Sequence, residues 1–467
     1  MKLMRALTVV CMAACSLVVN AQQTDYSKYF KSLPFAMSEV KAPQIPEREV
    51  KLTDFGAKGD GQTLCTEAFQ KAISTLKGQG GGHLIVPQGV WLTGPITLES
   101  NIDLHLNHGA IILFSGDIKL YPFVETIYEG GRRTRCQSPI TGMNLQNVSI
   151  TGSGVIDGNG VCWRPLKKEK VTEGQWKKIT SQGGMFVRAT RWQPSEEHAN
   201  HRPVMVHLES CKNVLLQGVI FQNSPAWNLH PLMCENIIID QVLVRNPAYA
   251  QNGDALDLES CKNALIVNSR FDAGDDGICI KSGKDKDGRR RGIPCENVVV
   301  DGCTVFAGHG GFVVGSEMSG GVKNIKVGNC QFVGTDVGLR FKSTRGRGGI
   351  VENIFIDGIS MSDISTYALT FNMYYGGKSV AEMLADGDNP DNQTKMPVNE
   401  ETPIFRNINI KNIVCNDAGR AMEFNGLPEM PIDGITLENV MIQAKKDAVF
   451  TNCQNIKKTN VVVKVVK

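Results

Sequence analysis

A repeat of about 27 residues runs through most of this chain, and it constrains the fold more than any other feature. Each unit begins with an asparagine that precedes a short run of mostly apolar, strand-forming residues. The successive asparagines are Asn213, Asn236, Asn263, Asn297, Asn324, Asn353 and Asn407. Their spacings are 23, 27, 34, 27, 29 and 54 residues, the last being twice 27. A fixed period in this range, built from strand-like units, predicts a solenoid of parallel strands.

A second alternating segment can be aligned in each unit. The segments are Val206–Ser210, Trp227–His230, Leu256–Ser260, Ile278–Ser282, Phe312–Ser316, Leu339–Ser343, Leu369–Asn372 and Met422–Asn425. Because successive side chains of a strand point to opposite faces, we expect the first and third residues of each segment to fill the interior and the second and fourth to face solvent. The fold class predicted is all-β, a right-handed parallel β-helix. A leucine-rich solenoid is disfavoured, since no helical periodicity separates the strands.

The chain has 467 residues, more than one compact core accommodates, and an elongated solenoid solves that problem. An apolar stripe from Cys65 to Leu76 has helical spacing and predicts a helix that caps the N-terminal end of the solenoid. Two stretches, 158–203 and 374–403, interrupt the repeat and are expected to be long loops. Such insertions either gather on a binding face or only decorate the surface. We expect 22–467 to form a single β-helix domain.

Residues 1–21 have the features of a signal peptide. Lys2 and Arg5 precede an apolar run, and Val19-Asn20-Ala21 supplies a small-x-small cleavage site. The sequence therefore predicts export to the periplasm or the extracellular space. Anchoring as a lipoprotein at Cys15 is a second possibility, but the apolar run continues past that cysteine.

The remaining composition names no partner and no cofactor. With 50 Lys plus Arg against 47 Asp plus Glu, the chain lacks the basic excess of nucleic-acid binders. No long apolar run follows the N-terminus, so we expect no membrane span. The twelve cysteines after residue 21 include no CxxC pair and no metal-ligand spacing, and we interpret them as mostly buried thiols. We expect a monomer without a bound metal or cofactor.

Ionisable residues precede three adjacent strands of the predicted stack. Asp254 stands just before the segment at Leu256, Asp275 and Asp276 just before Ile278, and His309 just before Phe312. The next segment presents Arg340 and Lys342 on its outward face. Each motif alone is typical of a turn or a solvated surface. Their joint register indicates a site, because carboxylates held close together raise one another's pKa and are kept mainly for function.

Close carboxylates beside an exposed groove suit hydrolysis of a glycosidic bond, and the neighbouring cations favour an acidic sugar. The chain resembles glycoside hydrolase family 28, the polygalacturonases and related pectin hydrolases. The motifs that carry the resemblance are Asn252-Gly253-Asp254, Gly274-Asp275-Asp276, Gly308-His309-Gly310 and Arg340-Phe341-Lys342. It departs from the family at Gly253, where members have threonine, and at Phe341, where they have isoleucine. The segment 315–321 is similar to the exo-acting bacterial branch.

The resemblance implies an inverting hydrolase that cleaves α-1,4-galacturonosidic linkages of pectin. Asp275 would be the general acid, Asp254 and Asp276 would activate water, and His309 would support their ionisation states. Arg340 and Lys342 would hold the sugar carboxylate. Asn252 and His230, on neighbouring coils, are further candidates for substrate binding.

Three other functions stay open. A rhamnogalacturonan hydrolase of the same fold is one alternative, because glycine at position 253 lacks the hydroxyl that the family's threonine places beside the acids. A pectate lyase would need Ca²⁺ and a basic residue as the base. A non-catalytic glycan-binding solenoid would have no reason to align three acids.

Overall fold

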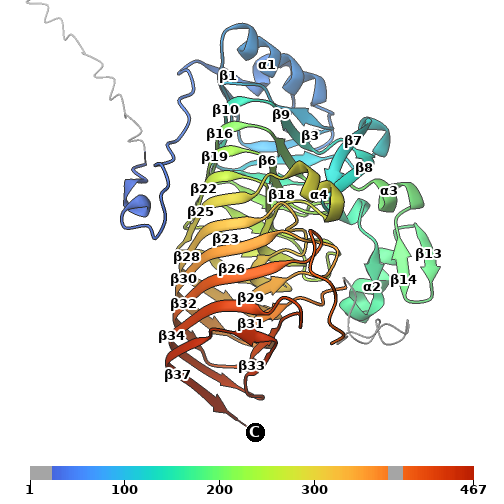
Figure 1. The fold of residues 1–467 in the computed structure, drawn as a ribbon. Helices are drawn as coiled ribbons and strands as arrows, with labels where there is room; N and C mark the ends of the chain where they lie inside the picture. The colour runs from blue at the N-terminus through green and yellow to red at the C-terminus, as the bar shows by residue number, and fades with distance from the viewer. Residues whose placement is uncertain (1–23, 377–392, 467) are drawn as a thin grey trace, which may run out of the picture.

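The computed structural model describes residues 24–376 and 393–466. Over these residues the chain winds into an elongated solenoid of parallel strands, with helix α1 (Thr66–Gly78) near one end and β37 (Lys457–Val465) at the other (Figure 1). The predicted right-handed parallel β-helix is confirmed. Among the described residues no helix is both long and apolar enough to cross a membrane. The predicted signal peptide, 1–21, and residues 377–392 of the second interruption lie outside the described ranges.

One sheet of eleven parallel strands runs along the solenoid and carries the aligned segments. In spatial order its strands are β4 (Ile96–Thr97), β9 (Ile140–Met143), β15 (Val206–Glu209), β18 (Leu229–Leu232), β21 (Leu256–Glu259), β24 (Asp276–Lys281), β27 (Gly310–Val314), β29 (Val337–Lys342), β31 (Ile364–Asn372), β33 (Ala418–Asn425) and β35 (Val449–Thr451). We call it the site sheet, because the candidate residues lie on it.

The remaining strands of the solenoid form one 21-stranded sheet with two rows. The first row is β1 (Glu49–Lys51), β2 (Gly82–Val86), β5 (Ile102–Leu106), β10 (Gln146–Gly152), β16 (Lys212–Gln217), β19 (Glu235–Asp240), β22 (Lys262–Val267), β25 (Cys295–Asp301), β28 (Val322–Val333), β30 (Ile350–Ser362), β32 (Ile404–Cys415), β34 (Ile432–Ala444), β36 (Cys453–Gln454) and β37. The second row is β3 (Gly89–Thr93), β6 (Ala110–Phe114), β11 (Val155–Asp157), β17 (Ile220–Gln222), β20 (Leu243–Arg245), β23 (Arg270–Asp272) and β26 (Thr304–Phe306), and it merges with the first at β28.

The interior is filled as the alternation predicts. In seven of the eight aligned segments the first and third residues belong to the continuous apolar core, for example Leu256 and Leu258. The segment at Trp227 is wrong by two residues, because Leu229, not Trp227, pairs with Val206 and Leu256. Trp227 lies outside the core and packs on Tyr128, with ring centroids 4.6 Å apart.

The second and fourth residues of the site-sheet segments point outward, as expected, but several do not face solvent. Asp257 and Glu259 on β21 have no exposed surface, and Lys281 on β24 is 4% exposed. Arg291 of α4 (Asp285–Arg291) pairs with Glu259, and Lys281 lies 3.3 Å from Asp257. The prediction that these positions face solvent is therefore wrong over these coils.

The repeated asparagines form a ladder along the solenoid. Each adopts a left-handed backbone, as Asn263 does with φ 57°, which asparagine tolerates better than most residues. The side-chain amide of Asn263 donates to Asn236 at 3.3 Å, and that of Asn297 donates to Asn263 at 3.1 Å. The sequence repeat thus reflects a turn that must recur once per coil.

The N-terminal helix caps the solenoid as predicted: Phe69, Ala72, Ile73 and Leu76 of α1 are buried in the core. Short 3₁₀ turns occur at η1 (Ser27–Phe30), η2 (Leu52–Phe55) and η3 (Ile118–Leu120), and η2 contacts α1. All twelve cysteines of the described ranges are free thiols, and ten of them are buried, which confirms their interpretation as small apolar residues.

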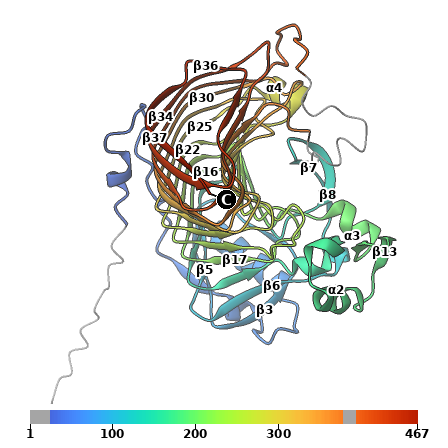
Figure 2. The same cartoon turned by 90° about the horizontal axis from the view of Figure 1, so that it is seen from below.

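The first interruption is more than a loop. It contains η4 (Gly160–Cys162), β12 (Leu166–Lys167), η5 (Lys168–Lys170), α2 (Glu173–Thr180), β13 (Met185–Arg188), β14 (Arg191–Gln193) and α3 (Glu196–His201). Trp176 and Trp192 pack in a small apolar cluster of its own. An antiparallel hairpin, β7 (Phe123–Tyr128) and β8 (Gly131–Cys136), was not predicted. The hairpin and the first interruption project from the same side of the coils (Figure 2).

Replacement of Asn263 should destabilise the solenoid. We expect Asn263→Ala to lower the free energy of unfolding by about 1–3 kcal/mol, since it removes two ladder hydrogen bonds and places a Cβ without a local hydrogen bond at positive φ. Asn263→Gly should cost less, because glycine accepts this backbone freely. Asn416→Ala, at an exposed position without positive φ, is the control. Denaturant unfolding measures all three, and equal stability of Asn263→Ala and Asn416→Ala would contradict a structural role for the ladder.

Candidate active site

Strand register brings the predicted site residues together. Leu256 pairs with Ile278, Ile278 with Phe312, and Phe312 with Leu339. The residues that lead into β21, β24 and β27 therefore stack on consecutive coils, and β29 follows beside them. The register inferred from the apolar alternation is confirmed.

Backbone hydrogen bonds fix these lead-in segments to one another. Ala255 N–H donates to Asp276 O at 3.0 Å, and His309 N–H donates to Asp275 O at 2.7 Å. Gly308 adopts φ 103°, and a Cβ there would lie 2.6 Å from the same Asp275 oxygen. Only glycine permits this approach, which places His309 directly over Asp275.

The three aspartates form a compact cluster. Each offers a carboxylate oxygen, and these oxygens lie within 4.8 Å of one another. Asp254 and Asp276 are 3% and 1% exposed, whereas the Asp275 side chain is 24% exposed. Asp275 is therefore the acid that a ligand reaches most easily. In an inverting enzyme a water lies between the two carboxyl groups, which are therefore more widely separated. The nearest carboxylate oxygens of these aspartates are closer together than that.

Asp276 is held as a carboxylate by two cations. Lys342 Nζ donates to its Oδ2 at 2.6 Å, and Arg340 Nη1 donates to its Oδ1 at 3.2 Å. Burial acts to raise the pKa of Asp276, but Lys342 and Arg340 outweigh it and hold that pKa well below its usual range. Arg340 and Lys342 also lie over the ring of Tyr375, at 5.5 and 4.9 Å. Both cations are thus engaged by the protein's own carboxylate.

Asp275 and His309 form a second charged pair. His309 Nδ1 lies 3.0 Å from Asp275 Oδ1, and the ring's Nε2 lies 3.8 Å from Asp336. Burial would raise the pKa of Asp275, yet the hydrogen bond and charge of His309 lower it. The hydrogen bond that Asp275 accepts raises the pKa of His309 in turn, against the effect of the ring's burial. The charge of His309 thus opposes the effect of the neighbouring carboxylates, and the lowered pKa of Asp275 argues against its being the protonated member of the pair in the free protein.

Asp254 behaves in the opposite way. Burial, followed by the charges of Asp257 and Asp275, raises the pKa of Asp254 well above its usual value. Its Oδ1 is buried and has no hydrogen-bond partner among the described residues. Asp254 is therefore the aspartate of the trio that is most readily protonated in the free protein.

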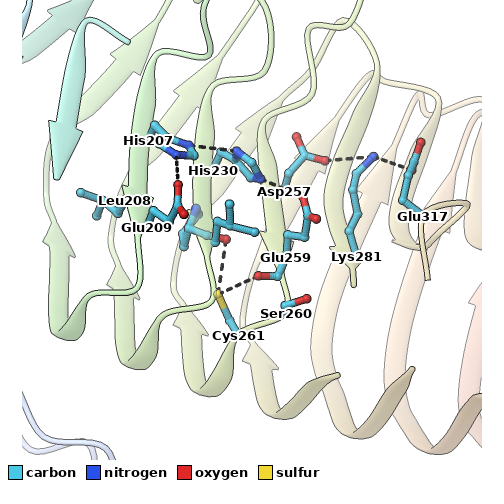
Figure 3. A network of polar contacts seen from close by, with 12 residues as sticks. His207, Leu208, Glu209, His230, Asp257, Glu259, Ser260, Cys261, Lys281 and Glu317 are labelled. Atoms are coloured by element: carbon cyan, nitrogen blue, oxygen red, sulfur yellow. Dashed lines mark hydrogen bonds and ion pairs between the residues drawn. The ribbon is translucent and has the colours of Figure 1, made fainter. Parts of the chain in front are cut away.

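A chain of buried charges extends outward from the site along the neighbouring strands (Figure 3). Lys281 Nζ lies 3.3 Å from Asp257 and 3.1 Å from Glu317. Burial raises the pKa of Asp257 to about 8. Asp257 and Lys281 lie on the outward face, as the alternation predicts, but that face is covered here and not solvated. The sequence contained a signal for both residues, because each is a charged residue at an outward position of a coil that carries a site aspartate.

The two further binding candidates lie close by but are not free. His230 has no exposed surface: its Nε2 lies 3.0 Å from Glu259 and its Nδ1 3.3 Å from His207 (Figure 3). Both ring nitrogens are therefore engaged by protein groups in this conformation, and neither is available to a sugar. Asn252 is half-buried and accepts a hydrogen bond from Arg202 Nη2 at 2.8 Å. Tyr375 and Arg202, which contact site residues, were not singled out as site residues from the sequence.

Gly253 has a local structural explanation. A Cβ at this position would lie 2.6 Å from the Ala250 Cβ and 2.8 Å from the Ala250 carbonyl oxygen. Threonine would not fit without movement of that turn. The departure from threonine thus follows from packing against Ala250, which weakens the argument for a different sugar.

The aspartates could also hold a cation, because oxygens at such spacing are the ligands of hard divalent ions. Both oxygens of Asp276, however, already accept hydrogen bonds from Lys342 and Arg340. A divalent ion would be placed beside two fixed positive charges. The donor set therefore fits a hydrogen-bonded water better than a metal ion.

Comparison with known proteins agrees with this site. Residues 82–463 match the model of the glycosyl hydrolases family 28. A probable polygalacturonase from Vitis vinifera is 31% identical over 430 residues, covering 90% of this chain and 79% of the relative. An exo-poly-α-D-galacturonosidase from Dickeya chrysanthemi is 29% identical over 70% of this chain and 57% of its own length. The crystal structure of a hyperthermoactive exopolygalacturonase from Thermotoga maritima superposes with a TM-score of 0.76 at 36% identity, covering 91% of this chain and 94% of that one. The chain is a glycoside hydrolase and belongs to family 28 of the glycosyl hydrolases.

Proposed function

We propose that this enzyme hydrolyses α-1,4-galacturonosidic linkages of pectin from a chain end, with inversion at the anomeric carbon. The observation that carries the proposal is the aspartate trio in register with His309, Arg340 and Lys342. The polygalacturonase and exo-acting relatives support the substrate and the mode of attack. The N-terminal sequence pattern supports export, and we infer that the mature chain acts as a monomer on polymer outside the cytoplasm.

We assign Asp275 as the residue that donates a proton to the glycosidic oxygen. His309 supplies that proton to Asp275. Asp275 is the most accessible acid of the trio, so the glycosidic oxygen can approach it. His309 holds the proton in the free protein, 3.0 Å away. As the leaving oxygen gains charge, His309 Nδ1 passes its proton to Asp275 and Asp275 delivers one to that oxygen, so the pair loses one proton in total. A proton-sharing pair keeps the acid supplied although the pKa of Asp275 is lowered.

Asp276 is the base in this mechanism, since its pKa is lowered and it stays ionised. Asp254, with its raised pKa and unpartnered oxygen, orients the attacking water. The short spacing of the nearest oxygens would suit a retaining enzyme with a carboxylate nucleophile. Neither candidate nucleophile is free, however: both oxygens of Asp276 accept hydrogen bonds from cations, and Asp254 is readily protonated. Water attack, and therefore inversion, follows from these charge states.

The function is tested with defined oligosaccharides. We expect release of galacturonate units from homogalacturonan oligomers and no cleavage of rhamnogalacturonan, because Gly253 is explained by packing. Proton NMR of the first product from the α-linked substrate should show the β-anomer, and EDTA should leave the rate unchanged. An initial α-anomer would overturn the inverting mechanism. Unsaturated products that absorb in the ultraviolet would instead indicate a lyase.

Asp275→Asn should abolish turnover while the protein still folds, because an amide keeps the shape but cannot donate the proton. Loss of a general acid typically lowers kcat by about 10²- to 10⁴-fold. Asp363→Asn, at an exposed position with φ 56° where asparagine is well tolerated, is the control and should keep full activity. Steady-state kinetics and thermal melts decide, and retention of more than about half of kcat in Asp275→Asn would remove this residue from the role.

Lys342→Met should shift the acid limb of the kcat/KM profile to higher pH. Lys342 helps to lower the pKa of Asp276, so its removal raises that pKa, and the base is then lost at a higher pH as the solution is acidified. The activity lost at neutral pH should be smaller than that lost at acid pH. Lys326→Met, on β28 of the other sheet, is the control. An acid limb that stays in place would show that Lys342 does not set the ionisation of the base.

A further inference from the structure

Three arginines beside the site are buried without a carboxylate partner. Arg135, Arg164 and Arg202 are 8%, 4% and 6% exposed. Within residues 24–376 and 393–466 no acid forms an ion pair with any of them. They donate instead to neutral oxygens: Arg135 to the Arg202 carbonyl, and Arg164 to the Ser224 carbonyl at 3.0 Å. Each also has a buried Nε without a partner.

Such uncompensated burial contrasts with the other well-covered arginines. Arg291 pairs with Glu259, and Arg340 pairs with Asp276. Burial of an unpaired charge is costly, and it lowers the pKa of Arg164 to about 10. Proteins hold such groups mainly where an anion completes the site.

Two of these cations, Arg202 and its neighbour Arg135, lie near Asp254. Arg202 donates to the Gln251 carbonyl and to Asn252 Oδ1, both at 2.8 Å, and so contacts the turn that carries Asp254. The guanidinium of Arg135 lies 3.7 Å from the centroid of the Tyr128 ring, and the Tyr128 hydroxyl is buried without a partner. The charges of Arg202, Arg135 and Asp254 all act on Tyr128.

The position is distinct from that of Arg340 and Lys342. Arg135 precedes β9 and Arg202 precedes β15, on coils that come before Asp254 in the stack. Arg340 and Lys342 lie on β29, beyond it, and both are engaged by Asp276. The cations that lack a carboxylate are therefore on the opposite side of the aspartates.

We propose that Arg135, Arg202 and Tyr128 form a second subsite that binds the carboxylate of the galacturonate unit on the Asp254 side of the scissile bond. Two guanidinium groups and a hydroxyl offer charge-assisted hydrogen bonds to a sugar carboxylate, and a neutral sugar would leave them unpaired. Arg164 adds positive potential from the insertion 158–203. This subsite rests on the proposed hydrolase function and specifies which unit of its substrate must be acidic.

The alternative is that these arginines have only a structural role and hold the hairpin and the insertion against the coils through hydrogen bonds to backbone carbonyls. It predicts no dependence on ligand charge. We therefore expect galacturonate to raise the Tm of the wild-type protein and galactose, at the same concentration, to leave it unchanged. Arg135→Met keeps the stacked stem and should abolish the galacturonate shift. Arg133→Met, an exposed arginine on the same strand, should retain it.

The kinetic counterpart compares free-acid with methyl-esterified galacturonate oligomers. Arg135→Met should lower kcat/KM about 10- to 100-fold on the free acid and little on the ester, because a charge-assisted hydrogen bond is lost only with the former. Arg135→Lys should recover part of the preference. If Arg135→Met does not fold, Tyr128→Phe serves, since it removes only an unpartnered hydroxyl and should also weaken free-acid selectivity.

The outcomes separate the subsite from the proposed activity. A Tm shift that needs both the carboxylate and Arg135 supports the subsite even if wild-type protein hydrolyses no galacturonan, in which case the activity is wrong. Equal losses on acid and ester in Arg135→Met, or a galacturonate shift unchanged in that variant, overturn the subsite while the hydrolase function stands.

Discussion

Parallel strand pairing between successive coils is the interaction on which the rest of this structure depends. Residues that lie one coil apart in sequence become neighbours across a backbone hydrogen-bond ladder, at the spacing of adjacent strands. The asparagine ladder repeats the turn of each coil, and the apolar alternation fixes which side chains enter the core. Asp254, Asp276 and His309 lie side by side because the strand register places the residues that lead into consecutive strands next to one another.

Charge compensation then decides what the converged groups can do. Asp276 is neutralised by Lys342 and Arg340, whereas Asp254 is buried, no cation within residues 24–376 and 393–466 pairs with it, and its pKa rises. Asp275 shares its environment with His309, which stores a proton beside it. In the proposed mechanism one cluster of like residues therefore supplies a base at Asp276, a group that orients water at Asp254 and an acid at Asp275, because their environments move their pKa values in different directions.

The surroundings of the site divide the positive charges into two kinds. Arg340 and Lys342 are committed to an internal carboxylate, and Arg135 and Arg202 are not. The hairpin β7–β8 and the insertion 158–203 supply the second kind, from outside the regular coils. Variation in these additions can change the recognised sugar without disturbing the stacked aspartates, because they do not contribute strands to the solenoid sheets.

The sequence by itself determined the solenoid, its register outside the 227–230 segment, the capping helix and the stack of Asp254, Asp275, Asp276 and His309, because all of these follow from local periodicity. Only the tertiary structure decided the pKa shifts of these residues and the burial of the outward side chains. His230, Asp257 and Lys281 are buried by segments distant in sequence, and the 227–230 segment slipped by two because both registers alternate. No local pattern encodes that Lys342 would contact Asp276, 66 residues away, or that Arg135 and Arg202 would meet beside Asp254. Burial and pairing depend on all the neighbours of a side chain, and only the folded chain assembles them.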